Sequence, residues 1–404
     1  MPSFVRRFKV LFASPRGRLI SLWLSFFLYW GAIASFIPYL SLYYDNIGLT
    51  GTQIGTLNSV RSALSFISAI IIAFLSDVLR RRKLVFILCI LGMILLLAIF
   101  PSMATFITIL PVIALYSALQ TPNIAILDQE TLSVLENPRD YSMVRVGGSF
   151  GVGIITLLTG LIVDRPGMPF TIIFLLHIIL LLILLLLVLC MPGSHDQQKQ
   201  GKIPSYKDVL ALFRIPGFAL WLGIIFLFGF GDASQVNFLF LHIRNVGGSA
   251  SLMGLATTFS IVGEIAGYYL AQRVQLRVGS RRMIVLSFVF RTIWFVLIAL
   301  NRTPLLVLPI QVLNGISFAL IGAGSVAYVN ERAPAHIGTT AQGVRNAILI
   351  RLSGVVGSLF SGAIYQRSGP VHMYLVLAAI SAASLVLAIL LRRAERRRET
   401  LQSA

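Results

Sequence analysis

The chain has 404 residues, of which 57% are hydrophobic and only 12% charged, and its net charge is +19. Several apolar runs approach or exceed the ~20 residues with which an α-helix spans a bilayer, so the composition excludes a soluble protein and predicts a polytopic membrane protein. On a soluble surface such a charge would indicate a nucleic-acid partner. Here the basic residues lie mainly in loops between apolar runs, so we expect no nucleic-acid binding.

The apolar runs predict an all-α integral membrane protein with twelve transmembrane helices. The predicted ranges are 19–44, 53–76, 84–102, 105–134, 142–163, 169–191, 216–243, 249–273, 283–300, 304–329, 339–365 and 371–391. The first run has no small-residue cleavage site, so we interpret it as a helix and not as a signal peptide.

An internal repeat divides the chain into two pseudo-symmetric six-helix bundles. The segment 46–55 recurs at 245–254, and Arg145 with its glycines recurs at Arg351. We therefore expect an N-terminal bundle over 1–192, a cytoplasmic linker over 193–215, and a C-terminal bundle over 216–404 that ends in a basic tail. Parallel halves of this kind place a solute site between them near the membrane midplane.

The distribution of basic residues predicts the orientation. Of the 33 Lys and Arg residues, 24 lie in alternate loops and the two termini, and only four lie in the other loops. Basic residues accumulate on the cytoplasmic side of membrane proteins. We therefore predict that both termini and the linker are cytoplasmic, in a multi-pass protein of the cell inner membrane.

Charged residues inside the predicted helices are the main functional candidates. Each costs about 2.5–3.5 kcal/mol in hydrocarbon on insertion scales, so it is expected only where it is paired or lines a wet cavity. Asp128 and Glu130 end the fourth predicted helix and Arg145 begins the fifth, so either acid can face the arginine across a short turn. This corner is interpreted as part of a solute cavity.

A second group of candidates lies deeper in the second half. Asp232 follows two glycines that permit a local break of the helix, and Asp232 can pair with Arg291 or Arg351. Glu264 is near the middle of its helix, where desolvation favours the protonated carboxyl and so a role as proton carrier. Arg291 and Arg351 are themselves candidates for binding or coupling. The remaining candidates are Gln311, Asn314 and Arg61.

No metal, cofactor or catalytic chemistry is predicted. Cys89 and Cys190 lie within apolar runs, the five histidines show no ligand spacing, and no nucleophile–base pair stands out, so we do not expect an enzyme. Five arginines lie inside predicted helices, against four acids. The surplus of one positive charge favours an anionic substrate slightly over a neutral one. The intrahelical arginines are Arg61, Arg145, Arg291, Arg345 and Arg351.

The loop after the second predicted helix reads Ala-Phe-Leu-Ser-Asp-Val-Leu-Arg-Arg-Arg-Lys over 73–83. It resembles the signature loop of the major facilitator superfamily, and the chain resembles that superfamily over nearly its whole length. The resemblance implies a gating role for Asp77, Arg81 and Arg82. Two glycines of the family pattern are replaced here by Ala73 and Arg80.

A finer resemblance is to the branch of lactose-permease-like and phenylpropionate-permease-like transporters. It rests on the segments 38–55, 145–151 and 311–318 together with Glu264 and Arg291. The resemblance implies that Asp128 and Arg145 contact the solute and that Glu264 lies near it. Lactose permease has a tryptophan, a histidine and a carboxylate where this chain has Val152, Asn314 and Ser317, so neither a lactose-like substrate nor its proton relay is implied.

We therefore predict a secondary active transporter that moves a small organic solute by alternating access, coupled to protons as a symporter. The substrate is either an aromatic or other organic acid, or a sugar or nucleoside. An uncoupled facilitator or a drug-type exporter of the same fold is the alternative, and a non-transporting membrane sensor is a weaker one. The expected partners are a small-molecule substrate, protons and the lipid bilayer, and the expected state is a monomer.

Overall fold

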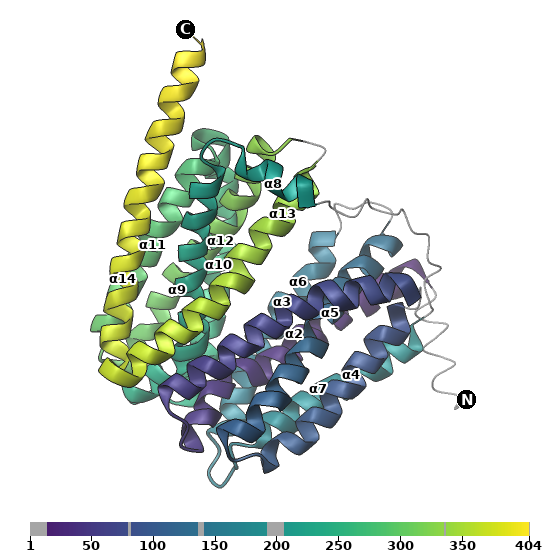
Figure 1. Ribbon diagram of the computed structural model, residues 1–404. Helices are drawn as coiled ribbons and strands as arrows, with labels where there is room; N and C mark the ends of the chain where they lie inside the picture. The colour runs from purple at the N-terminus through teal and green to yellow at the C-terminus, as the bar shows by residue number, and fades with distance from the viewer. Residues whose placement is uncertain (1–13, 80–81, 136–140, 192–205, 335–336, 404) are drawn as a thin grey trace. The chain divides into compact units, whose positions relative to one another are not determined.

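The structure is all-helical. The computed structural model describes residues 14–79, 82–135, 141–191, 206–334 and 337–403, and every regular element in these ranges is a helix (Figure 1). In this part of the chain, ten helices are long and apolar enough to cross a membrane. One of the ten, Thr340–Arg393, has 54 residues, which is far more than one bilayer crossing needs.

A break inside α14 (Ser353–Ser403) divides this long stretch into two spans. Gly369 has a φ of 76° and a ψ of 177°, which interrupts the helical geometry, and Pro370 starts the next helix. Another span is α3 (Gly51–Leu79), whose 29 residues also suffice for a crossing. With α3 and the division at Gly369, the described helices account for the twelve predicted membrane helices.

Contacts between residues group the chain into two compact units, which we call unit 1 and unit 2. Unit 1 contains the whole of α2 (Pro15–Asn46), α4 (Arg82–Ile99), α5 (Phe106–Val134), α6 (Tyr141–Val163) and α7 (Ile172–Cys190). Unit 2 contains the whole of α8 (Tyr206–Phe213), α9 (Phe218–Asn245), α11 (Ser280–Leu300), α12 (Val307–Arg332), α13 (Gly338–Asn346), the π-helix η5 (Ala347–Leu352) and α14.

Two helices are shared between the units. The first turns of α3, within Thr50–Ser59, belong by their contacts to unit 2, and the rest of α3 belongs to unit 1. The reverse holds for α10 (Ala250–Val278), whose start, within Ser249–Thr258, belongs to unit 1. The predicted bundle boundaries at 193–215 stay a prediction, because most of that linker lies outside the described residues.

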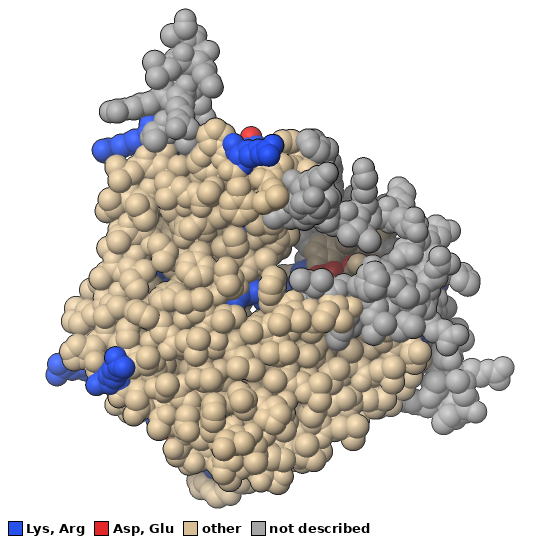
Figure 2. Space-filling view, in the orientation of Figure 1, with Lys and Arg blue, Asp and Glu red and all other residues tan. Residues whose placement is uncertain are grey.

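The surface carries the apolar side chains that a lipid environment requires. Large hydrophobic residues are widely exposed, for example Ile107 at 79%, Leu95 at 70% and Leu186 at 63%. In unit 2, most of the face seen in Figure 2 is uncharged, and its visible Lys and Arg side chains lie mainly toward the helix ends. Exposed apolar area on this scale would be unusual on a soluble monomer and is normal for helices that face hydrocarbon.

Unit 1 is held together by close helix packing and an aromatic cluster. Gly147 and Gly151 let α6 approach the backbone of α2, because a Cβ at either position would collide with a carbonyl oxygen of α2. Deeper in the unit, Phe36 packs against Phe100, Tyr116 and Phe174. The one hydroxyl among these four rings is satisfied, since Tyr116 OH is hydrogen-bonded to His177 Nε2 at 2.9 Å.

Unit 2 depends on a similarly close approach of α10 and α12. A Cβ at Gly263 would collide with the Val312 carbonyl, and a Cβ at Gly315 would collide with the backbone at Ser260 and Glu264. Small residues at both positions bring the two backbones into direct contact. This contact places Ser260 and Asn314 side by side, which matters for the site described below.

The starts of α3 and α10 are equivalent positions of the internal repeat. At each of them, a backbone amide donates a hydrogen bond to a side-chain oxygen. The amide of Gly51 donates to Gln366 Oε1 at 2.6 Å within unit 2. Its repeat counterpart, Ala250, donates to Asp164 Oδ1 at 2.9 Å within unit 1, and Ser251 N donates to Asp164 Oδ2 at 2.8 Å. Both side chains satisfy amide groups that a helix start leaves without an internal partner.

The contact between α10 and α12 predicts a stability effect. Gly315→Ala should lower stability by about 1–3 kcal/mol, because the added methyl group overpacks the helix interface. Gly223→Ala is the matched control, since Gly223 is exposed on α9 and a Cβ there meets no atom within 4 Å. The measurement is the apparent unfolding midpoint of the detergent-solubilised protein. A midpoint for Gly315→Ala equal to that of the control would contradict the packing argument.

The Asp164 contact predicts a pH-dependent effect. Burial alone would raise the pKa of Asp164, but its hydrogen bonds to Ser251 and Ala250 outweigh burial and hold the pKa below its ordinary value of 3.8. The stabilisation is therefore present above about pH 4 and is lost as the pH falls through the lowered pKa. Asp164→Ala should cost about 0.5–2 kcal/mol at neutral pH, as removal of a helix cap does.

The thermal midpoint of Asp164→Ala should thus fall below that of the wild type at pH 7, and the two should converge in strongly acidic buffer. Arg165→Ala, at the exposed neighbouring position, is the control and should leave the thermal midpoint unchanged both at pH 7 and in acidic buffer. A difference for Asp164→Ala that grows as the pH falls would contradict the assignment.

Candidate functional site

The central polar group of unit 2 is the guanidinium of Arg291 on α11. The residue is 1% exposed. Its Nη2 donates to Asp232 Oδ1 on α9 at 2.7 Å, and its Nη1 donates to Asn314 Oδ1 on α12 at 2.6 Å. Asp232 is 25% exposed, so the acid lies at the more accessible end of the ion pair.

The Arg291 group continues onto a fourth helix and is enclosed by aromatic rings. Asn314 Nδ2 donates to Ser260 Oγ on α10 at 3.0 Å. The Arg291 guanidinium carbon lies 4.4 Å from the ring centre of Phe228, with Trp294 and Phe295 at 5.7 and 5.8 Å. Aromatic faces stabilise a desolvated cation in such positions. The Nε of Arg291 has no hydrogen-bond partner among the described residues.

Of the two arginines that the sequence proposed as partners for Asp232, the structure pairs Arg291 with it. The expected break of the helix at the preceding glycines is not seen, since α9 is continuous from Phe218 to Asn245. The glycines serve packing instead: a Cβ at Gly229 would collide with the Leu349 carbonyl of η5. Gly229 therefore allows α9 to lie directly against the π-helix.

Glu264 lies near the Arg291 group but is not joined to it directly. It is half-buried on α10, one turn after Ser260, and its amide lies against Gly315. Arg291 makes no hydrogen bond or ion pair with Glu264 in the described part of the chain; its carboxylate partner is Asp232. Gln311, a further predicted residue, is 1% exposed on α12, and its Oε1 has no partner among the described residues.

In unit 1, a tyrosine takes part in the corner that was predicted around Asp128 and Arg145. Tyr141 OH donates to Asp128 Oδ1 at 2.6 Å, and the positive charge of Arg145 acts on both residues. The guanidinium of Arg145 lies over Trp30 at 4.7 Å and over Phe26 at 5.3 Å. No ion pair joins Arg145 to Asp128 in the described residues, so the corner combines an acid–tyrosine bond with an arginine on aromatic rings.

The structure also describes the surroundings of two other predicted residues of unit 1, Glu130 and Arg61. Glu130 lines a small, mainly apolar cavity of about 50 Å³ together with Lys83, whose Nζ donates to the Met191 carbonyl at 2.6 Å. Arg61 is half-buried on α3, close enough to Tyr44 for its charge to act on that residue. Both Glu130 and Arg61 have further partners in the structure.

The proposed gating residues are not located in detail. Arg81 lies outside the described residues, and Asp77 and Arg82 lie at the end of α3 and the start of α4, where side chains are also outside the described part. Arg351, half-buried on η5, is one of the residues with partners elsewhere. Among the described residues, no group of three or more His, Cys, Asp or Glu side chains is placed to hold a metal ion.

Arg345 is one of the five intrahelical arginines but is not among the predicted site residues. Arg345 is 8% exposed on α13, and its three hydrogen bonds go to Gln342, Ser325 and Asn346. A signal for this cluster is present in the sequence: Gln342, Arg345 and Asn346 have the i, i+3, i+4 spacing that places side chains on one face of a helix. Their partner Ser325 could not be found in this way because it comes from α12.

Comparison with known proteins identifies the family. The sequence pattern of the MFS_1 like family matches residues 19–376. The chain is 24% identical over 353 residues to a protein of Escherichia coli named "Probable 3-phenylpropionic acid transporter", covering 86% of this chain and 91% of that protein. It is 25% identical over 380 residues to the maltose permease of Geobacillus stearothermophilus, covering 92% and 94%.

A solved structure agrees with this assignment at the level of the fold. A mutant of the nucleoside transporter NupG superposes with a TM-score of 0.83 at 19% identity, covering 92% of this chain and 99% of that one. The predicted fold class of twelve membrane helices is thereby confirmed. The chain belongs to the MFS_1 like family of the major facilitator superfamily, and it is a multi-pass membrane transporter of small solutes, not an enzyme.

Proposed function

We propose that the protein is a proton-coupled symporter that moves a small organic solute by alternating access. The observation that carries the proposal is the Asp232–Arg291 pair, in which a partly exposed acid neutralises a buried arginine. A proton that binds Asp232 removes this negative charge and leaves the arginine to be neutralised by another group. The pair can thus link protonation to a rearrangement of the helices that carry it.

The neighbouring polar residues support Asp232 as the proton carrier. Asn314 and Ser317 stand where the resemblance to lactose permease would have supplied titrating groups, and neither takes up a proton at ordinary pH. Both have structural bonds instead, Asn314 with Arg291 and Ser317 with the Ser287 carbonyl at 2.9 Å. Glu264 is the second acid at this depth and the alternative carrier.

Both predicted substrate classes have support among the relatives. One relative is named for an aromatic acid and another for a sugar, and the solved structure is that of a nucleoside transporter. For unit 1 we propose that Arg145 contacts the solute, since its guanidinium faces two aromatic rings and has no carboxylate at ion-pair distance in the described residues. Asp128 is held by Tyr141 and completes that contact surface.

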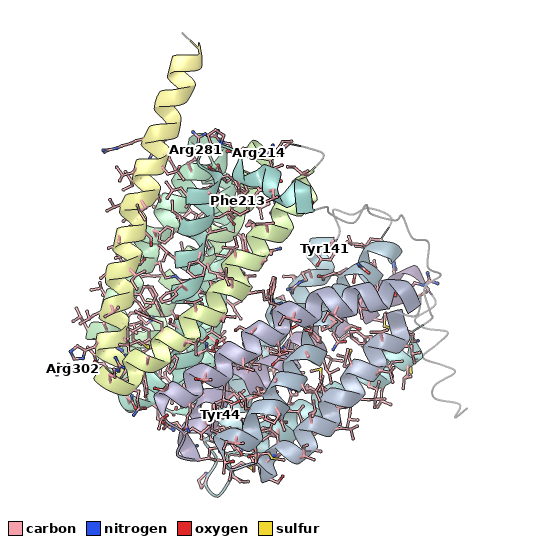
Figure 3. All side chains as sticks on the ribbon, in the orientation of Figure 1. Tyr44, Tyr141, Phe213, Arg214, Arg281 and Arg302 are labelled. Carbon is pink, nitrogen blue, oxygen red and sulfur yellow. The ribbon has the colours of Figure 1, made fainter. Side chains whose placement is uncertain are left out.

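The proposed orientation places both termini and the linker in the cytoplasm. It rests on the concentration of basic residues in alternate loops. Within unit 2, Arg214 and Arg281 lie at one end of the helices and Arg302 lies at the other (Figure 3). The first end is then cytoplasmic and the second faces the opposite side.

The orientation predicts opposite labelling of two engineered cysteines. Arg214→Cys and Arg302→Cys, each in a background with Cys89→Ala and Cys190→Ala, replace exposed side chains at the two ends of unit 2. An impermeant maleimide added to intact cells should label the cysteine at 302 and not the one at 214. Permeabilised cells, where both should react, are the control. Labelling of 214 from outside would overturn the orientation.

The coupling proposal predicts that Asp232→Asn loses pH-driven accumulation by at least tenfold, because asparagine keeps the hydrogen-bond acceptor but does not exchange a proton. Exchange of labelled substrate without a gradient should fall much less. The measurement is uptake into proteoliposomes of labelled 3-phenylpropionate, maltose and uridine, with and without an imposed pH gradient, against empty liposomes.

Glu264→Gln is the matched variant for the second acid. If only that variant loses pH-driven accumulation, the proton carrier is Glu264 and the role of Asp232 is structural. Wild-type uptake that ignores the gradient would identify an uncoupled facilitator and contradict the symport proposal.

A further inference from the structure

A cavity of about 490 Å³ opens beside Arg345 in unit 2. It lies within the size range of small-molecule sites in proteins. Its polar lining comes from Arg345, Asn346 and Asn330, and its aromatic lining from Tyr268 and Phe318. The two rings are 46% and 36% exposed, so they remain uncovered by the protein around them.

The charge of Arg345 is not neutralised by the protein. Its Nε donates to Gln342 Oε1 at 2.9 Å, Nη1 to Ser325 Oγ at 2.8 Å and Nη2 to Asn346 Oδ1 at 2.7 Å. All three acceptors are uncharged, and no carboxylate of the described residues lies within ion-pair distance. Arg291 in the same unit, by contrast, has Asp232 as its counterion. A buried cation without a counterion is costly in an apolar surrounding.

These three bonds fix the Arg345 guanidinium and use three of its N–H donors, so two N–H donors remain. A guanidinium has five N–H groups; the three bonds use the Nε–H and one hydrogen on each terminal nitrogen. Gln342 is fixed in turn, because its Nε2 donates to the Asn330 side chain at 3.0 Å and to the Val326 carbonyl at 3.1 Å. The remaining hydrogens, one on each terminal nitrogen, match the two oxygens of a carboxylate.

We propose that this cavity binds the carboxylate group of an organic acid and that such acids are the substrate class of the transporter. The carboxylate binds Arg345, the side-chain amides of Asn330 and Asn346 flank it, and the apolar body of the acid lies against Phe318 and Tyr268. The substrate part of this inference rests on the proposed transport function; the binding part does not.

The test is calorimetric binding to the purified full-length protein in detergent. The probes are 3-phenylpropionate and its neutral analogue 3-phenylpropan-1-ol, with maltose and uridine as neutral solutes of the other class. We expect the acid to bind at least tenfold more tightly than the alcohol, since a carboxylate forms charge-assisted hydrogen bonds that the hydroxyl does not replace. Equal affinity of acid and alcohol would overturn the proposal.

The decisive variant is Asn346→Asp. It preserves the side-chain volume and retains Arg345, but it places a carboxylate where it pairs with the guanidinium and repels the ligand. Its affinity for the acid should fall by about tenfold to a hundredfold, the range expected for loss of a hydrogen bond to a charged group. Arg345→Gln should have an effect at least as large, and Asn346→Asp covers the case in which that variant does not fold.

The matched control is Arg332→Gln, which removes an arginine of unit 2 that lies over Tyr328 and does not line the cavity. It should leave acid binding within about twofold of the wild type. Unchanged acid binding in both Asn346→Asp and Arg345→Gln would overturn the assignment of the site.

Transport assays separate this inference from the proposed function. If maltose or uridine is transported and no acid binds, the anion site is wrong and the transport function stands. If the acid binds through Arg345 but solute uptake into proteoliposomes ignores an imposed pH gradient, the symport proposal is contradicted and the binding site stands.

Discussion

Burying a guanidinium group among membrane helices is costly unless the group is hydrogen-bonded and its charge is compensated, and four helices of unit 2 supply the groups that do this for Arg291. The residue itself is on α11, Asp232 is on α9, Asn314 is on α12, and Ser260 on α10 extends the chain of bonds. In hydrocarbon no water can replace any of these partners. The four helices are therefore linked through one hydrogen-bonded network around a single ion pair.

The close approach of helix backbones makes this network possible. Gly263 and Gly315 bring α10 and α12 into direct contact, which places Ser260 within hydrogen-bond distance of Asn314. Gly229 does the same for α9 and η5. In lipid there is little hydrophobic force between helices, so contact at small residues and polar bonds between side chains hold them together. In unit 2, the same close helix contacts therefore hold the helices together and position the polar side chains.

Arg345 shows how differently a buried arginine can be held in the same unit. Its bonds to Gln342, Ser325 and Asn346 fix the orientation of the guanidinium without cancelling its charge. Arg291 is neutral as a pair, whereas Arg345 has no counterion among the described residues and lies next to a cavity. The first arrangement is suited to a change of protonation, and the second to an anionic ligand.

The sequence by itself determined the membrane class, the twelve helices and the repeat, because long apolar runs and recurring segments are local properties that need no knowledge of packing. It also offered Arg291 and Arg351 as possible partners of Asp232, because an intramembrane charge is expected to be paired or to line a wet cavity. Only the tertiary structure selected Arg291 over Arg351 as the partner of Asp232. It also showed that Tyr141 bonds Asp128 beside Arg145, and that the hydrogen-bond partners of Arg345 are uncharged. Pairing of this kind depends on the rotation and separation of helices far apart in the chain, and a one-dimensional pattern does not contain that information.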